Sequence, residues 1–107
     1  TNDVTAQSDR RVKENIRLIE GGLEKVERMN GYTFTRGEDP TKKKMGVIAQ
    51  ELLEIIPEVV HYDEESDRYS VAYGNIVGVL IEAIKDLSSE LDELKKFVKF
   101  GEKKDDR

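Results

Sequence analysis

The sequence predicts an α+β protein with a small globular head of short strands and helices, followed by one long C-terminal helix that forms a coiled coil. Three observations support this fold class. Apolar residues repeat with heptad spacing in the last third of the chain, short β-rich runs occupy its middle, and 107 residues suffice for one domain but not for two independent cores. Charged residues make up 38% of the chain against a typical ~25%, so the core of the head must be small.

The heptad pattern is the strongest periodic signal in the sequence. Apolar residues alternate spacings of three and four over three heptads, which is the a/d repeat of a coiled coil. We call this set the seam; it consists of Val77, Leu80, Ile84, Leu87, Leu91, Leu94 and Val98.

The seam predicts self-association but leaves the number of helices open. With Val77 at an a position, the a residues are Val, Ile and Leu while every d residue is Leu, which does not separate two strands from three. Glu90 at g precedes Lys95 at e by five residues, the spacing of interhelical ion pairs between parallel chains in register. The alternative is an amphipathic helix packed on its own sheet. Strands of ~4 to 6 residues span only ~13 to 20 Å, against ~33 Å for the helix, so its distal half needs another partner.

The sequence of the first half of the head predicts an arm, a helix, a strand and a loop. Residues 1–15 are polar and read as an arm, whereas apolar positions at helical spacing over 16–29 predict a short helix that Asn30-Gly31 ends. Residues 32–35 alternate aromatic with hydroxyl side chains and predict a strand. Residues 36–44 contain glycine, Asp-Pro and three lysines, and predict a solvated loop with a mobile tip.

The second half predicts a strand running into a short helix, and then a hairpin. Residues 45–51 begin as a strand, and a helical stripe follows until Pro57 ends it. Residues 59–62 and 69–71 are β-rich runs that we expect to pair. Off the seam, three apolar residues widen the apolar face where the head is expected to cover the long helix: Ile76, Ile81 and Ala83.

Composition excludes several kinds of chemistry. A net charge of -5 disfavours binding to nucleic-acid phosphates, even through Arg10, Arg11 and the lysines of residues 42–44. Without Cys, and with His61 as the sole histidine, a thiolate nucleophile or a zinc cluster is not expected. We therefore predict no metal and no cofactor. No apolar run reaches the ~18 residues that span a bilayer, so no membrane partner is expected.

Ser8 and Lys13 are the candidate nucleophile and base. A lysine deprotonates a serine only when its own amine is neutral, which requires desolvation or cationic neighbours such as Arg10 and Arg11. The alternative is a serine that caps a turn, followed by an ordinary solvated lysine. The spacing of these two residues alone favours the second interpretation.

Three segments of the sequence together resemble one known family. They are residues 8–16 (SDRRVKENI), residues 46–51 (GVIAQE) with 57–60 (PEVV), and residues 69–73 (YSVAY) leading into 80–85 (LIEAIK). In this order and spacing they are similar to the intramolecular chaperone auto-processing domain found at the C-termini of phage tail spikes, tail fibres and neck appendages.

The resemblance implies a homotrimeric chaperone that aligns an upstream, β-rich stem of the same polypeptide and then cuts itself off. Carried onto this chain, the cleaved bond is Gln7–Ser8, with Ser8 as nucleophile and Lys13 as general base of a serine endopeptidase. Asn15 or the backbone amides after Ser8 are candidates to stabilise the oxyanion. The expected location is the host cytoplasm during virion assembly, with release from the mature fibre after cleavage.

The resemblance also implies a division of the chain. Residues 1–7 are expected to end the client stem, 8–73 to form the head with its arm, 74–100 the coiled-coil helix, and 101–107 a disordered polar tail. The competing hypothesis is a non-catalytic coiled-coil trimerisation module of a structural protein, in which Ser8 and Lys13 are incidental.

Overall fold

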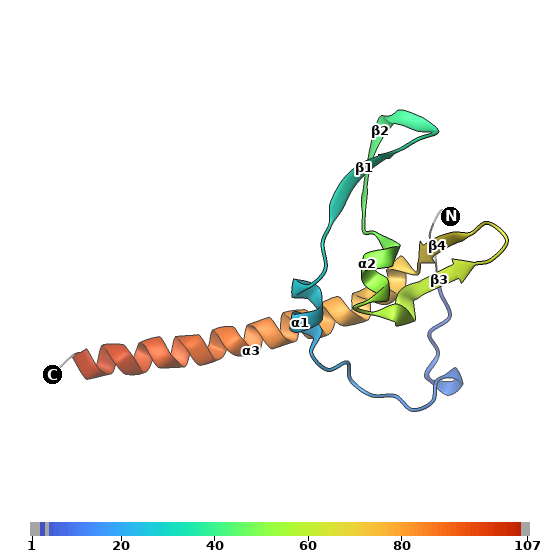
Figure 1. Ribbon diagram of the computed structural model, residues 1–107. Helices are drawn as coiled ribbons and strands as arrows, with labels where there is room; N and C mark the ends of the chain where they lie inside the picture. The colour runs from blue at the N-terminus through green and yellow to red at the C-terminus, as the bar shows by residue number, and fades with distance from the viewer. Residues whose placement is uncertain (1–2, 4, 106–107) are drawn as a thin grey trace.

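A computed structural model describes residue 3 and residues 5–105 of the chain, without the side chains of 102–105. Two hairpins and two short helices sit at one end of a long C-terminal helix, and an extended arm leads into them (Figure 1). The expected α+β class, with a small head and a long helix, is confirmed. The elements in chain order are η1 (Arg10–Val12), α1 (Gly22–Glu27), β1 (Tyr32–Arg36), β2 (Asp39–Gly46), α2 (Ala49–Leu53), η2 (Pro57–Val59), β3 (Val60–Asp63), β4 (Arg68–Val71) and α3 (Tyr73–Asp105).

The first hairpin corrects one expectation. Residues 36–44 were expected to be a loop, but β2 pairs antiparallel with β1, with Thr33 opposite Met45 and Phe34 opposite Lys44. The strand lacks an apolar alternation because most of its side chains, the three lysines included, are exposed. Backbone pairing with β1 therefore defines this strand, and the hairpin projects away from α3 (Figure 1).

The second hairpin confirms the predicted pairing of residues 59–62 with 69–71. β3 and β4 are antiparallel, with His61 opposite Ser70 and Tyr62 opposite Tyr69. The Tyr62 and Tyr69 rings lie 4.9 Å apart between centroids, a cross-strand pair that stabilises the hairpin. Before this hairpin, the expected step from strand to short helix is present, since β2 ends at Gly46 and α2 begins at Ala49.

The helix expected over residues 16–29 is much shorter than its apolar pattern suggested. It begins only at Gly22, because Gly21 takes a left-handed φ of 66° as its N-cap. Gly22 is buried, and a Cβ there would lie 2.7 Å from the backbone nitrogen of Ala83, so α1 lies directly against α3. Of the two glycines that weaken a helix start in the sequence, Gly21 supplies the left-handed cap and Gly22 permits this close approach.

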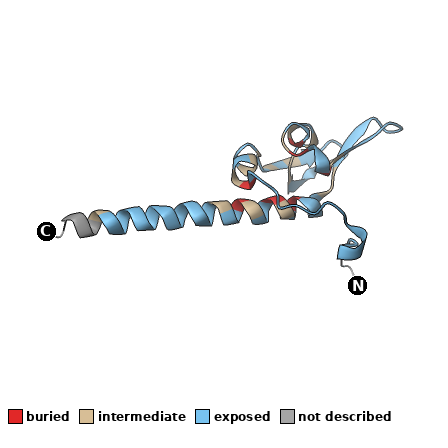
Figure 2. Ribbon diagram, turned by 90° about the horizontal axis from the view of Figure 1, so that it is seen from below, coloured by how far each residue is buried: buried red, intermediate tan, exposed pale blue. Residues whose placement is uncertain are grey.

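The core of the head is small and lies where α2 and η2 cover the first turns of α3 (Figure 2). Its buried side chains are between 1 and 7% exposed, and Leu52 is the most completely enclosed. From α3 only residues on one flank take part. The buried residues are Leu52, Ile56, Val59, Ile76, Val79 and Ala83.

The helix α3 leaves the head and continues alone. Its 33 residues correspond to about 50 Å of helix, and the radius of gyration is 19.8 Å, against about 13 Å for a compact domain of this length. The helix runs to Asp105, past the boundary at residue 100 expected from the sequence, while residues 106–107 lie outside the described residues. Of the three widening residues, Ile76 and Ala83 are buried by the head, but Ile81 is 50% exposed, because the head covers a single flank of α3.

Candidate functional site

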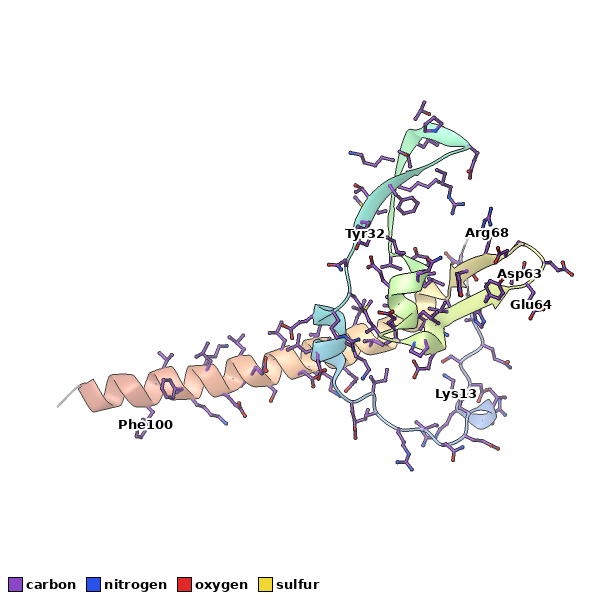
Figure 3. All side chains as sticks on the ribbon, in the orientation of Figure 1. Lys13, Tyr32, Asp63, Glu64, Arg68 and Phe100 are labelled. Atoms are coloured by element: carbon purple, nitrogen blue, oxygen red, sulfur yellow. The ribbon has the colours of Figure 1, made fainter. Side chains whose placement is uncertain are left out.

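Ser8 and Lys13 meet in the arm. The Lys13 ammonium donates a hydrogen bond to Ser8 Oγ, with 2.7 Å between Nζ and Oγ. The short turn η1 lies between the two residues and reverses the chain, since the backbone N–H of Lys13 bonds to the carbonyl of Arg10. Figure 3 shows Lys13 beside this turn, well away from the far end of α3 where Phe100 lies. One turn thus brings together Ser8 and Lys13, which are five positions apart in the sequence.

Asp9 holds this turn in shape. Its carboxylate accepts the backbone N–H of Arg11 at 2.8 Å and pairs with the Arg11 guanidinium, also at 2.8 Å. As the N-cap of η1 it satisfies a backbone donor that would otherwise be free. The Arg11 side chain holds the pKa of the Asp9 carboxyl below its usual range. Sequence analysis did not single out Asp9; the signal was an Asp just before a turn, a residue favoured at N-caps.

Arg11 therefore has a different role from the one considered from sequence. It was a candidate cationic neighbour for Lys13, but its guanidinium is bound to Asp9, so its charge is compensated. An ion pair screens the field that an isolated cation would exert on a nearby ammonium. Arg11 thus stabilises the turn, while Lys13 reaches the serine.

The contact has the geometry of a nucleophile and its base. A heavy-atom distance of about 2.6 to 3.2 Å permits direct proton transfer between the two groups, and 2.7 Å falls inside that range. Both side chains are exposed, so water reaches them freely in the single chain. In this state the lysine donates to the serine oxygen, whereas a base must accept the serine proton.

The other residues named from the sequence flank this contact. Gln7 immediately precedes Ser8 and is exposed. Asn15 lies two residues after Lys13 with a left-handed φ of 54°, an uncommon conformation that Asn tolerates better than most residues. It redirects the chain away from η1, and the arm then runs towards α3, where Ile19 packs beside Gly78. Asn15 is thus placed as a bend after the pair.

The seam is the second candidate site. All seven of its side chains are between 40 and 67% exposed in the single chain. Phe97 and Phe100 beside its distal end are exposed as well. A row of half-exposed aliphatic residues of this length is unusual on a monomeric protein and marks an interaction surface.

Two other kinds of site are absent from the part of the chain that is described. Among those residues, no group of three or more acidic or histidine side chains comes together in a way that would hold a metal ion. No helix within residues 5–105 is both long and apolar enough to cross a membrane.

The chain combines a small head, a long helix with an exposed heptad seam, and an arm in which a lysine contacts a serine. These features define a class of small domain with a candidate oligomerisation surface and a candidate processing site. Comparison with known families agrees. A family model whose name places it among the peptidases, and whose description is chaperone of endosialidase, matches residues 8–61. The chain belongs to this chaperone of endosialidase family.

Curated proteins that are similar to the chain include phage tail fibre proteins. The chain is 33% identical over 99 residues to the long tail fiber protein Gp37 of Enterobacteria phage K3, and 37% identical over 102 residues to that of Enterobacteria phage M1. These alignments cover 86 and 88% of the chain, but only 8 and 41% of the respective fibre proteins. The chain is thus similar to a minor part of much longer fibre proteins.

Proposed function

We propose that this domain is an intramolecular chaperone that assembles as a parallel homotrimer, registers an upstream fibre stem of the same polypeptide, and then releases itself by autoproteolysis between Gln7 and Ser8. The single observation that carries the processing step is the 2.7 Å contact between Lys13 Nζ and Ser8 Oγ next to that bond. Family membership and the tail fibre relatives support the chaperone role.

The seam provides the assembly step. Three copies that bury their seam residues against one another remove a row of half-exposed aliphatic side chains from water, which favours association. Chains joined in this way are held at a high effective concentration, which lowers the entropy cost of aligning three stems. A β-rich stem gains most from such help, because its non-local strand pairing folds slowly.

The chemistry is an acyl shift followed by hydrolysis. The Ser8 hydroxyl oxygen attacks the carbonyl carbon of Gln7 while its proton passes to the neutral amine of Lys13. The bond from that carbon to the Ser8 nitrogen then breaks, the nitrogen takes up a proton, and an ester joins Gln7 to Ser8 Oγ. Water hydrolyses the ester, leaving a carboxylate on Gln7 and both the hydroxyl and the new amino group on Ser8. Asn15 or the backbone amides after Ser8 are the candidate donors to the oxyanion.

Assembly gates this reaction. The pair is exposed in the single chain, and the lysine donates to the serine. Transfer of an ammonium into a covered site disfavours its charged form, so a client stem or a neighbouring copy that covers Lys13 converts it into a base. The same cover fixes Gln7 against Ser8. Cleavage after assembly then removes the registering device and makes the fold of the stem kinetically irreversible.

The proposed setting follows from the relatives. A stem resembling a phage tail fibre is made in the host cytoplasm during virion assembly, and the processed fibre no longer carries this domain. Residues 1–7 are then the last residues of the stem, and residues 1–2 and 4 of that segment lie outside the described residues.

A second function is favoured by one observation, the exposure of the Ser8 and Lys13 side chains. Under this alternative the domain is a non-catalytic trimerisation module, and the contact merely stabilises the turn in the arm. Both functions require the seam, so only chemistry at residue 8 distinguishes them.

The decisive experiment expresses the domain with its natural upstream stem. Wild type is compared with Ser8→Ala, Lys13→Ala and the surface control Lys43→Ala on a denaturing gel and by intact mass. We expect cleavage between Gln7 and Ser8 in wild type and in Lys43→Ala, and uncut chains in the two site variants.

The possible results separate the two functions. Uncut wild-type chains that still sediment as oligomers remove the peptidase function and leave the trimerisation module. Equal cleavage in Ser8→Ala and wild type removes Ser8 as nucleophile. A species of three chains by sedimentation, before and after cleavage, tests the trimer itself.

A further inference from the structure

The head covers one flank of α3, whereas the arm touches the other flank where Ile19 packs beside Gly78, a b position. With Val77 at an a position, Ile76 and Ala83 occupy g positions and Val79 a c position, and all three are buried by the head. The backbone N–H of Leu23 donates to Asp86, also at c, with 3.2 Å between the heavy atoms. Both c and g lie on one side of the seam.

The opposite flank presents an aliphatic side chain that its own chain does not cover. Ile81 occupies the e position on the other side of the seam and is 50% exposed. The next e positions along the helix are Ser88 and Lys95, so Ile81 is the one apolar residue among these three e positions. Neither the seam nor the head accounts for an isoleucine at this position.

The e and g residues of α3 match each other across neighbouring chains. In a parallel coiled coil in register, each g residue faces the e residue five positions later on the adjacent helix. Three such pairs fall within the described side chains, and they match apolar with apolar, small with small and acidic with basic. The pairs are Ile76 with Ile81, Ala83 with Ser88, and Glu90 with Lys95.

We infer that Ile81 of each copy packs against the head of the neighbouring copy, beside that copy's Ile76, and so completes the head core from outside. This inference rests on the proposed parallel assembly. The head lies on the g flank, which is the flank that meets the e residue of the next chain, so the neighbour's Ile81 arrives at the border of the head. Half-buried residues packed against that core, among them Val26, Met29 and Ile55, are the candidates for this contact.

The contact gives the assembly a means of fixing its register. The seam alone does not disfavour an alignment shifted by one heptad, because each of its positions is apolar and again faces an apolar residue after the shift. A slip of seven residues replaces Ile81 opposite Ile76 by Ser88 in one direction and by Gly74 in the other. Neither residue supplies an aliphatic side chain, so only the correct register buries Ile81 against the head.

Site-specific photocrosslinking tests this contact in the full domain. Ile81→benzoylphenylalanine is prepared alongside Leu87→benzoylphenylalanine, in the seam, and Lys85→benzoylphenylalanine, at a b position facing away from it. Mixing isotopically labelled with unlabelled chains identifies crosslinks between copies. We expect the probe at 81 to react with residues 22–29, 52–59 or 76–83 of another copy, the probe at 87 to react with the seam of another copy, and the probe at 85 to react with neither.

A matched pair of variants supplies an independent measurement. Ile81→Gln removes the aliphatic side chain, and Lys85→Gln makes a comparable change four residues later on the outward face. We expect Ile81→Gln to raise the dissociation constant of the oligomer about tenfold, measured by sedimentation, because it loses one buried aliphatic contact per interface. Lys85→Gln leaves the constant within about twofold of wild type, as expected for an exposed surface charge.

The failures of this inference and of the proposed function are distinguishable. Crosslinks between chains from position 87, combined with none from 81 to another head, overturn the inference while leaving the assembly intact. Equal dissociation constants for Ile81→Gln and Lys85→Gln overturn it as well. A monomer at micromolar concentration, with no crosslinks between chains from either position, removes the proposed assembly and the inference with it.

Discussion

The head and the distal part of α3 contain similar aliphatic residues but differ in how far they bury them. In the head, six apolar side chains are between 1 and 7% exposed, enclosed by elements of the same chain. Along the seam, seven apolar side chains are between 40 and 67% exposed, with no element of the same chain over them. The head therefore encloses its own core, whereas the helix beyond it presents a candidate interface.

The contrast shows where the stability of each region comes from. The head depends on contacts within one chain, so its folding is independent of concentration to a first approximation. In the proposed assembly the helix depends on other copies, and its stability rises with protein concentration by mass action. Changes that act on one region should leave the other nearly intact, which is the basis of the predictions that follow.

The largest effect is expected from a charge in the middle of the seam. In the proposed trimer Leu87→Asp places a carboxylate where three helices meet, and a buried unpaired charge costs several kcal/mol. We expect the dissociation constant to rise roughly a thousandfold, so that the domain sediments as a monomer at micromolar concentration. Chemical shifts of head residues should change little, except at the contact with the neighbouring copy's Ile81.

The matched control is Asp92→Ala, at an outward b position one turn further along α3. It should leave the sedimentation of the oligomer unchanged. If Leu87→Asp sedimented like wild type, the seam would not be the interface, and the contrast between the two regions would fail.

The next effect is expected in the core of the head. Leu52 is 1% exposed, and Leu52→Ala leaves a cavity between α2 and the first turns of α3. Large-to-small changes of this kind cost about 3 kcal/mol. Urea unfolding monitored at a head tyrosine, at fixed protein concentration, measures this loss.

Leu53, the next residue on α2, is exposed and provides the control. Leu53→Ala is expected to cost well under 1 kcal/mol, since it removes little buried area. Equal losses for both variants would mean that α2 does not pack on α3 as described.

Sequence patterns predicted the elements that carry a strong residue preference or repeat. The β3–β4 hairpin follows from its β-rich runs and the long helix from the heptad repeat, and both are present. The strand β2 was missed because it carries Lys42, Lys43 and Lys44 on an exposed ribbon, where backbone pairing replaces burial. Periodicity reports on burial, so elements that bury little escape it.

The start of α1 was misjudged for a related reason. Gly21 and Gly22 lower helix propensity, and the apolar residues before them extended the predicted helix to residue 16. In the structure Ile19 packs on α3 from an extended arm, and Gly22 allows two helices to touch. A tertiary contact of this kind leaves no periodic signal in the sequence.

That close contact gives a third prediction. In Gly22→Ala the new methyl group would lie 2.7 Å from the backbone nitrogen of Ala83 and 2.9 Å from the carbonyl carbon of Glu82. Backbone atoms yield little, so α1 must move away from α3, at a cost of about 2 kcal/mol of unfolding free energy. Gly31→Ala, with nothing within 4 Å of the new carbon, is the control and should be within about 0.5 kcal/mol of wild type.

The candidate processing site was only partly predictable from the sequence. The spacing of Ser8 and Lys13 suggested a pair but by itself favoured an ordinary turn, because five residues bring two side chains together only if the chain reverses between them. The reversal depends on Asp9, which caps η1 and binds Arg11. That interaction is local and charged, and nothing in the sequence distinguishes these two residues from other charged residues on a protein surface.

The smallest effect is therefore expected at Asp9, in the arm. Asp9→Ala removes the cap of η1 and leaves Arg11 unpaired, so the Ser8–Lys13 contact forms in a smaller fraction of the molecules. We expect self-cleavage to slow several-fold, while assembly is unchanged. Asp9→Asn keeps the acceptor for the Arg11 backbone N–H and should recover part of the rate. If Asp9→Ala cleaved at the wild-type rate, the turn would not position the pair.

The pH dependence of the turn gives an independent measure of the same role. The Arg11 side chain lowers the pKa of the Asp9 carboxyl, so the ionised form stabilises the turn above the usual aspartate range and this contribution is lost as the pH falls through the lowered pKa. The backbone amide signal of Arg11 in heteronuclear NMR should therefore titrate with a midpoint below that of an ordinary aspartate. A midpoint at the ordinary value would mean that Asp9 and Arg11 are not paired in solution, and the arm would then contribute no preformed geometry to the cleavage.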